Sequence, residues 1–286
     1  MNPFHTFVQE INDAIDKADK VPLGGVSARP QPEIAADAPR ALIFSPHPDD
    51  ECVVGTLPLR LLREDGMKVI NVAVTQGSRK DRQAERFKEL QTACELLGLG
   101  LIQTQPGGLE RIKCETRENE PDYWDACVQI IAEILRKNAP AVIFLPHSKD
   151  WNGTHIGTHF LVMDALKEAG AAVACTMVET EYWQPMWDPN LMVECPPDLL
   201  ADQIAGLTCH KGEIARNPYH LDLPAWMQDN VRRGSELVGG QGGGAADFRF
   251  AALYRVSRWE SGGLQTMVPP QKLLAAAESP RRMLNI

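Results

Sequence analysis

Short apolar runs alternate along the chain with longer segments in which apolar residues recur every three or four positions. The short runs have the length and composition of buried parallel strands, and the longer segments have the spacing of amphipathic helices. The expected strands are residues 41–44, 67–74, 141–145 and 171–181, and the expected helices are residues 81–97, 122–138 and 154–169. This alternation predicts an α/β fold with a Rossmann-like, mostly parallel sheet flanked by helices.

The chain is expected to divide into three parts. Residues 1–39 combine an N-terminal helix with a linker rich in proline, glycine and alanine, and residues 40–181 form the α/β core. Residues 182–286 form a C-terminal extension that packs on the core and completes the cleft. Within the extension, we expect helical segments at 197–216 and 224–237 and a strand at 248–256.

Two of the expected strands end in clusters of ionisable residues. The first runs into Pro46-His47-Pro48-Asp49-Asp50-Glu51, and strand 141–145 runs into a turn that contains His147. The carboxyl ends of parallel strands are where open α/β sheets bind ligands. Ionisable side chains packed there are costly unless their charge is compensated, and a divalent metal is the simplest compensation. The alternative is a helix N-cap turn whose carboxylates only face the helix dipole.

The hexapeptide at 46–51 resembles the P/A-H-P-D-D-E signature of the LmbE-like, PIG-L-type zinc deacetylases. These enzymes remove N-acetyl groups from glucosamine-containing substrates. The resemblance implies that His47 and Asp50 bind a metal and that Asp49 is the general base.

A second motif supplies the third ligand, because a catalytic zinc site needs three protein ligands and an open position. The family's second region reads D-x-H-P-D-H, with the last histidine on the metal, and aligning it with residues 150–155 places His155 there. His159, one helical turn later on the same face, is the alternative ligand. Asn152 stands where many members carry a histidine that polarises the substrate carbonyl. It keeps a hydrogen-bond donor for an oxyanion but cannot deliver a proton.

The helix at 81–97 carries a third resemblance. Arg86, Glu89, Ala93 and Leu97-Gly98 match the family's R-x-x-E-x-x-x-A-x-x-x-L-G segment, in which the arginine reaches the substrate. The alternative for Arg86 is an exposed ion pair with Glu89 at helical spacing. Residues 105–109 lack the Asp-Gly turn with which relatives grip a sugar hydroxyl, and this departure weakens the expected sugar contact.

Together these motifs predict a metal-dependent hydrolase that removes an N-acetyl group from an amino sugar or sugar conjugate. Zn²⁺ is the expected ion, and Fe²⁺, Co²⁺ and Mn²⁺ fit the same nitrogen and oxygen ligands. The metal activates water, Asp49 accepts its proton and Asn152 stabilises the oxyanion. Assistance to the departing amine is left open among His159, His210 and His220, of which His159 and His220 are also expected to bind substrate. Two alternatives stay open, an amidase for another small amide and a non-catalytic carbohydrate-binding relative.

Composition and charge limit the classes of partner that the protein is expected to bind. The net charge of −9 and the absence of a dense basic run argue against nucleic acid, and no apolar stretch is long enough to span a membrane. The seven cysteines are scattered and the N-terminus lacks a secretory pattern, so we expect a cytoplasmic protein. A homo-oligomer remains an open alternative.

Overall fold

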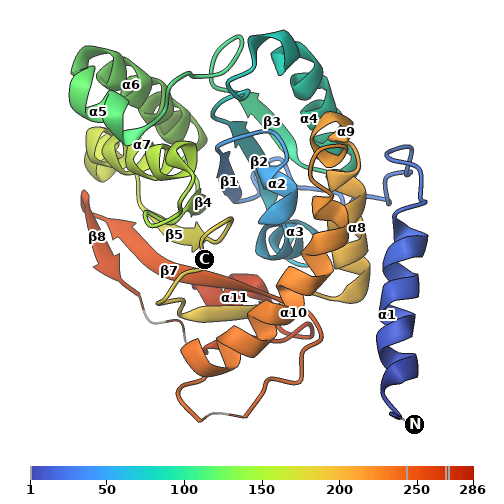
Figure 1. Cartoon of the computed structure of the whole chain (residues 1–286). Helices are drawn as coiled ribbons and strands as arrows, with labels where there is room; N and C mark the ends of the chain where they lie inside the picture. Colours follow the sequence, from blue (N-terminus) through green and yellow to red (C-terminus); the bar gives the residue numbers. More distant parts are fainter. Residues whose placement is uncertain (1, 243, 268, 270) are drawn as a thin grey trace.

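The computed structural model describes residues 2–242, 244–267, 269 and 271–286, and within these residues nine strands form a single sheet (Figure 1). The strands are β1 (Arg40–Ser45), β2 (Lys68–Ala73), β3 (Gly100–Gln103), β4 (Val142–Pro146), β5 (Cys175–Thr180), β6 (Leu191–Glu194), β7 (Ala251–Glu260), β8 (Gly263–Thr266) and β9 (Leu273–Leu274). Their order is β3-β2-β1-β4-β5-β7-β6-β9, and β8 pairs with β7. The five strands from β3 to β5 are parallel, whereas β7 runs antiparallel to both of its neighbours in this order. The expected mostly parallel α/β sheet is therefore confirmed.

Helices cover both faces of this sheet. They are α1 (His5–Ala18), α2 (Asp50–Val53), α3 (Thr56–Arg63), α4 (Gln83–Leu97), α5 (Cys114–Asn119), α6 (Pro121–Asn138), α7 (Gly153–Ala169), α8 (Pro197–Leu207), α9 (Lys211–Ile214), α10 (Tyr219–Leu237) and α11 (Pro280–Leu284). Figure 1 shows α6 and α7 together on one side and α4 and α8 on the other. Among the helices of the described residues, none combines the length and apolar character needed to cross a bilayer.

The alternation of side chains along β1 explains the two layers. Ala41 and Ile43 pack into a core with α3, α4 and α8, whereas Leu42 and Phe44 pack into a second core with α6 and α7. All four side chains are fully buried. Because a strand covered on both faces must be apolar on both, β1 is a continuous apolar run that becomes polar only where it ends.

The C-terminal part differs in detail from the sequence prediction. α8 ends at Leu207, a separate α9 follows, and α10 begins at Tyr219 with Pro224 inside it. The strand expected at 248–256 lies at Ala251–Glu260 and pairs with β5, with Tyr254 opposite Thr180. Residues beyond 181 thus extend the sheet of the core, and the three-part division stays a prediction.

The N-terminal helix is present at His5–Ala18 and stands apart from the sheet (Figure 1). Its apolar side chains, including those of Phe7, Val8, Ile11 and Ile15, remain exposed.

Candidate metal centre

The two polar turns lie side by side because the strands that precede them are neighbours. β1 and β4 pair in parallel, with Ala41 opposite Val142 and Ile43 opposite Phe144. The turn after β1 opens α2, and the loop after β4 opens α7. Both turns therefore meet at the carboxyl edge of the sheet, where α/β proteins bind their ligands.

Three side chains from these turns form a nearly equilateral triangle of ligand atoms. His47 Nδ1 lies 3.2 Å from His155 Nε2, and Asp50 Oδ2 lies 3.4 Å from each of these two nitrogens. A tetrahedral zinc ion with ligand bonds of about 2.0–2.1 Å separates its ligand atoms by about 3.3 Å. Two imidazoles and one carboxylate at this spacing fit one divalent ion with a fourth position left for water or substrate.

The charges around the triangle also suit a cation. Burial lowers the pKa of His47, which favours the neutral ring that a metal requires. Burial alone would raise the pKa of Asp50, but His155 and His47 hold it below its usual value. Burial alone would lower the pKa of His155, but the carboxylates of Asp50 and Asp150 raise it above its usual value. The carboxylates therefore attract positive charge to this point.

The three ligand side chains differ in their exposure to solvent. The side chains of Asp50 and His155 are 4% and 0% exposed, whereas that of His47 is 20% exposed. The rings of Tyr182 and His155 pack in a T-shaped arrangement, with ring centroids 4.7 Å apart. Of the three ligand side chains, that of His47 is therefore the most exposed to solvent.

Asp150 orients the His155 ring from behind. Its Oδ2 lies 3.5 Å from His155 Nδ1 and accepts from the backbone N–H of Trp183 at 3.2 Å, while its Oδ1 accepts from the backbone N–H of Asn152 at 2.8 Å. A carboxylate behind a ligating histidine fixes the ring and raises its basicity. The sequence prediction gave Asp150 no role, although a carboxylate shortly after a buried strand and five residues before a ligand was the available signal.

Asp49 is held in a strained backbone conformation beside the triangle. Its φ is +110° and its ψ is −28°, a combination that costs a non-glycine residue about 1–3 kcal/mol. It occupies the N-cap position of α2, so this turn does open a helix, but the Asp49 side chain makes no capping hydrogen bond. Burial raises the pKa of Asp49 well above its usual value, and Asp50 adds to the rise while Arg86 opposes it. A carboxylate with a raised pKa is suited to accept a proton.

Arg86 reaches the site from α4. Its Nη2 donates to the carbonyl oxygen of Pro48 at 2.8 Å and lies 3.7 Å from Asp49 Oδ1 and 4.0 Å from Glu213 Oε2. The alternative pairing with Glu89 is absent from this arrangement, because Glu89 instead accepts from the backbone N–H of Gly212 at 3.1 Å. Arg86 thus lies against the candidate base, and its role toward substrate stays a prediction.

Asn152 forms the N-cap of α7. Its Oδ1 accepts from the backbone N–H of Thr154 at 2.9 Å, and the residue is half-buried. Because Oδ1 is used in the cap, Nδ2 is the atom that would donate to a substrate.

The remaining predicted histidines lie outside the triangle. His159 Nδ1 donates to the carbonyl oxygen of Pro146 at 2.9 Å, so that ring is bound to the end of β4. His210 is bound to Glu51, with Nε2 2.7 Å from Oε1. His220, in the first turn of α10, is buried, which lowers its pKa, and its charged neighbours are Asp19 and Asp222.

The C-terminal part also supplies Tyr219, which the sequence prediction did not single out. The Tyr219 ring packs 4.9 Å from that of Trp183, and burial together with Glu213 and Asp49 raises the Tyr219 pKa to about 12. Its hydroxyl therefore stays protonated and is a potential donor. A single tyrosine in a helix carries no sequence signal for such a position.

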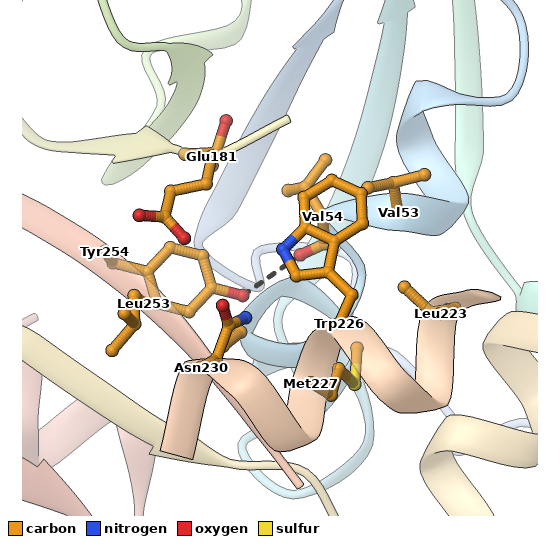
Figure 2. Close-up of a pocket in the computed structure, with 11 residues that line it drawn as sticks. Val53, Val54, Glu181, Leu223, Trp226, Met227, Asn230, Leu253 and Tyr254 are labelled. Carbon is orange, nitrogen blue, oxygen red and sulfur yellow. Dashed lines mark hydrogen bonds between the residues drawn. The ribbon is translucent and has the colours of Figure 1, made fainter. Parts of the chain in front are cut away.

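A small cavity lies beside the C-terminal end of α2 (Figure 2). It is lined mainly by apolar side chains of α10 and β7, and the Tyr254 hydroxyl at its wall donates to the carbonyl oxygen of Val54 at 3.0 Å. Glu181 also lines it and forms an ion pair with Arg233, with Nη2 2.7 Å from Oε2. None of His47, Asp50 and His155 lines this cavity, so it is separate from the ligand triangle.

Solved structures of proteins with different activities share the fold of this chain. The N,N'-diacetylchitobiose deacetylase from Pyrococcus horikoshii has 16% identity and a TM-score of 0.55, covering 92% of this chain and 96% of its own. The 4-carboxy-2-hydroxymuconate hydratase GalB from Pseudomonas putida has 17% identity and a TM-score of 0.55, with 76% and 95% covered. The A40926 pseudoaglycone deacetylase Dbv21 has 16% identity and a TM-score of 0.55, with 77% and 98% covered. At such identities the likeness shows the fold alone.

The sequence comparison is more specific. No curated protein matches the chain, but residues 42–166 match the family model described as PIG-L, GlcNAc-PI de-N-acetylase. The matched segment contains both polar turns and all three atoms of the ligand triangle. Over residues 42–166 this chain is therefore similar to the PIG-L family, and its fold is shared with the solved deacetylase structures.

Proposed function

We propose that this chain is a metal-dependent N-deacetylase that acts on an N-acetylated amino sugar or sugar conjugate. The observation that carries the proposal is the ligand triangle of His47, Asp50 and His155 with the Asp49 carboxylate beside it. The PIG-L match and the two deacetylases of the same fold support the reaction class and the kind of substrate.

The proposed reaction is hydrolysis of an amide. A bound divalent ion, Zn²⁺ in the first place, would polarise the amide carbonyl and acidify the attacking water. Asp49 accepts a proton from that water, and the hydroxyl joins the acyl carbon. The C–N bond then breaks and a proton joins the nitrogen, so that the products are acetate and a free amine.

The proton that reaches the departing amine has a candidate source in Asp49 itself. The rings of His159 and His210 are bound to Pro146 and Glu51, and the charged neighbours of His220 are Asp19 and Asp222. Asp49, in contrast, lies beside the triangle, and its pKa is raised. A carboxyl group protonated in the first step is able to return the proton in the second, so we propose Asp49 for both.

Arg86 and Asn152 are proposed to orient the reacting groups. Arg86 keeps the Asp49 carboxylate in place through their 3.7 Å contact and presents a cation to the substrate. Asn152 Nδ2 donates to the oxyanion that develops on the acyl oxygen.

Asn152→Asp separates this donor from the helix cap. Aspartate keeps the capping oxygen at the start of α7, so folding stability should stay within about 0.5 kcal/mol of wild type. It has no N–H to donate, so kcat should fall about 100-fold, as for other lost oxyanion donors. Steady-state kinetics and thermal unfolding measure the two effects. An Asn152→Asp enzyme with wild-type kcat would remove Asn152 from the mechanism.

The function itself is tested by acetate release. Metal-free protein is prepared with a chelator and reloaded with Zn²⁺, Fe²⁺, Co²⁺ or Mn²⁺, and each form is incubated with N-acetylglucosamine, N,N'-diacetylchitobiose and N-acetylglucosaminyl conjugates. We expect equal amounts of acetate and free amine, formed only by the metal-loaded protein. Release from simple N-acetyl amides but not from sugars would favour the amidase alternative. Binding of these sugars without any release would favour the non-catalytic relative.

A further inference from the structure

The strained backbone of Asp49 accompanies a hydrogen-bonded pair of Glu51 and His210, of which only His210 lies outside the matched segment. Glu51 Oε2 accepts from the backbone N–H of Asp49 at 3.0 Å, and Glu51 Oε1 faces His210 Nε2 at 2.7 Å. The Cys52 thiol also donates to Oε1, at 3.2 Å. Glu51 and His210 are 0% and 1% exposed, so water does not compete with these bonds.

The geometry points to His210 as a positioning residue for Asp49, acting through Glu51; this inference rests on the proposed function of Asp49. His210 donates from Nε2 to one oxygen of the Glu51 carboxylate, which leaves the other oxygen aimed at the Asp49 N–H. That bond holds residue 49 at φ +110°, and this backbone conformation sets the direction of the Asp49 side chain. Loss of the pair would let the backbone relax and turn the carboxylate away from the triangle.

The Glu51–His210 pair joins the matched segment to the C-terminal part of the chain. His210 precedes α9, at the end of α8, and therefore lies beyond the matched segment 42–166. Glu213 of α9, the helix that His210 precedes, has its Oε2 4.0 Å from Arg86 Nη2, so this region also contacts the arginine that lies against Asp49. The C-terminal part of the chain thus supports the geometry of a site whose proposed metal ligands and base lie in the matched segment.

A second reading is that Glu51, Cys52 and His210 themselves hold a metal, since their ligand atoms lie within 4.8 Å of one another. The 2.7 Å separation of His210 Nε2 and Glu51 Oε1 is that of a direct hydrogen bond, which already satisfies both atoms. The Glu51 carboxylate thus accepts hydrogen bonds from three donors, which are His210 Nε2, the Cys52 thiol and the backbone N–H of Asp49. These contacts favour positioning over ligation.

Two polar substitutions of matched character test the inference. In His210→Gln the side-chain amide nitrogen extends about as far from the backbone as Nε2 does, so the hydrogen bond to Glu51 is kept. In His210→Asn the side chain is shorter, and its amide nitrogen does not reach Glu51. We expect His210→Gln to keep kcat within about threefold of wild type and His210→Asn to lower it about 10–100-fold, as small misplacements of a reacting group do. KM and the metal content of both should match wild type.

A double-mutant cycle separates positioning from general stabilisation. If His210 acts through Asp49, His210→Asn should have no further effect on the residual rate of Asp49→Asn. Amide hydrogen exchange adds a readout that needs no substrate. His210→Asn should speed exchange in a peptide covering residues 46–54 and leave the β1 amides unchanged. This second readout keeps the inference distinguishable from the proposed function, because it stands even when no sugar is deacetylated.

Three outcomes would overturn the inference. They are equal activity of the Gln and Asn variants, additive effects of His210→Asn and Asp49→Asn, and unchanged exchange around residue 49. Should His210→Asn fail to fold, Glu51→Gln keeps the side-chain size, and its kcat should fall with metal retained. If the metal content of Glu51→Gln falls in step with its kcat, the pair belongs to a metal site and the positioning role is wrong.

Discussion

Asn in place of Asp49 is expected to lower kcat by about 10²–10⁴-fold, the usual worth of a general acid–base group, and to leave bound metal unchanged. The amide of asparagine does not accept a proton at neutral pH, so the attacking water loses its base. Asparagine is the right replacement because it tolerates positive φ better than alanine does, and residue 49 has φ +110°. Steady-state kinetics and elemental analysis of the same preparations give both quantities.

The neighbouring residue provides the matched control for this experiment. Asp50→Asn changes the same chemical group one position later, but Asp50 Oδ2 is a corner of the ligand triangle. We therefore expect Asp50→Asn to lose metal and activity together, whereas Asp49→Asn loses activity alone. If both variants keep full turnover, neither carboxylate has the proposed role.

Removal of His155 is expected to have the largest effect on metal binding. His155→Ala deletes one of three ligands from a fully buried position, so the protein should bind less than about 0.1 equivalents of Zn²⁺ under conditions that load the wild type with about one. Equilibrium dialysis followed by elemental analysis measures this loss, and activity should disappear with the metal.

His159→Ala is the control for this second variant. His159 is also buried in α7, one turn after His155, but its ring is bound to the carbonyl oxygen of Pro146. We expect His159→Ala to lose some stability through that hydrogen bond and to keep its metal. Loss of metal from His159→Ala with retention in His155→Ala would show that the second motif was placed in the wrong register.

The parallel core was predictable because its signals are local. β1 and β4 are apolar on both faces, since helices cover both, and their polar residues begin only where the strands end. α4 ends at Leu97 and is followed by Gly98 with φ +80°, the glycine typical of a helix C-terminus. The four-residue strands β3 and β6 are too short to carry a period and were not predicted.

Side-chain direction was the part of the site that spacing did not determine. His155 and His159 share a helix face, yet one ring points to the triangle and the other to the end of β4. Arg86 and Glu89 have the spacing of a helix pair, but each is bound to a partner distant in sequence, Pro48 and Gly212. Such choices depend on which elements pack against the helix, and that information is not contained in one segment.

The long-range contacts of the C-terminal part were also beyond local reasoning. His210 was considered only as a proton donor, and its bond to Glu51 joins residues 159 positions apart. The aromatic contact between Trp183 and Tyr219 is similar, because it depends on where α10 begins. These contacts form because the folded sheet brings the N-terminal and C-terminal parts of the chain together, so no single segment indicates them.

The central claim is that His47, Asp50 and His155 hold one divalent metal ion. Anomalous diffraction at the zinc absorption edge, from crystals of the zinc-loaded protein, tests it most directly. We predict a single strong peak within bonding distance of His47 Nδ1, Asp50 Oδ2 and His155 Nε2. A fully loaded protein with no peak at that position, or with its only peak at Glu51, Cys52 and His210, would contradict the account.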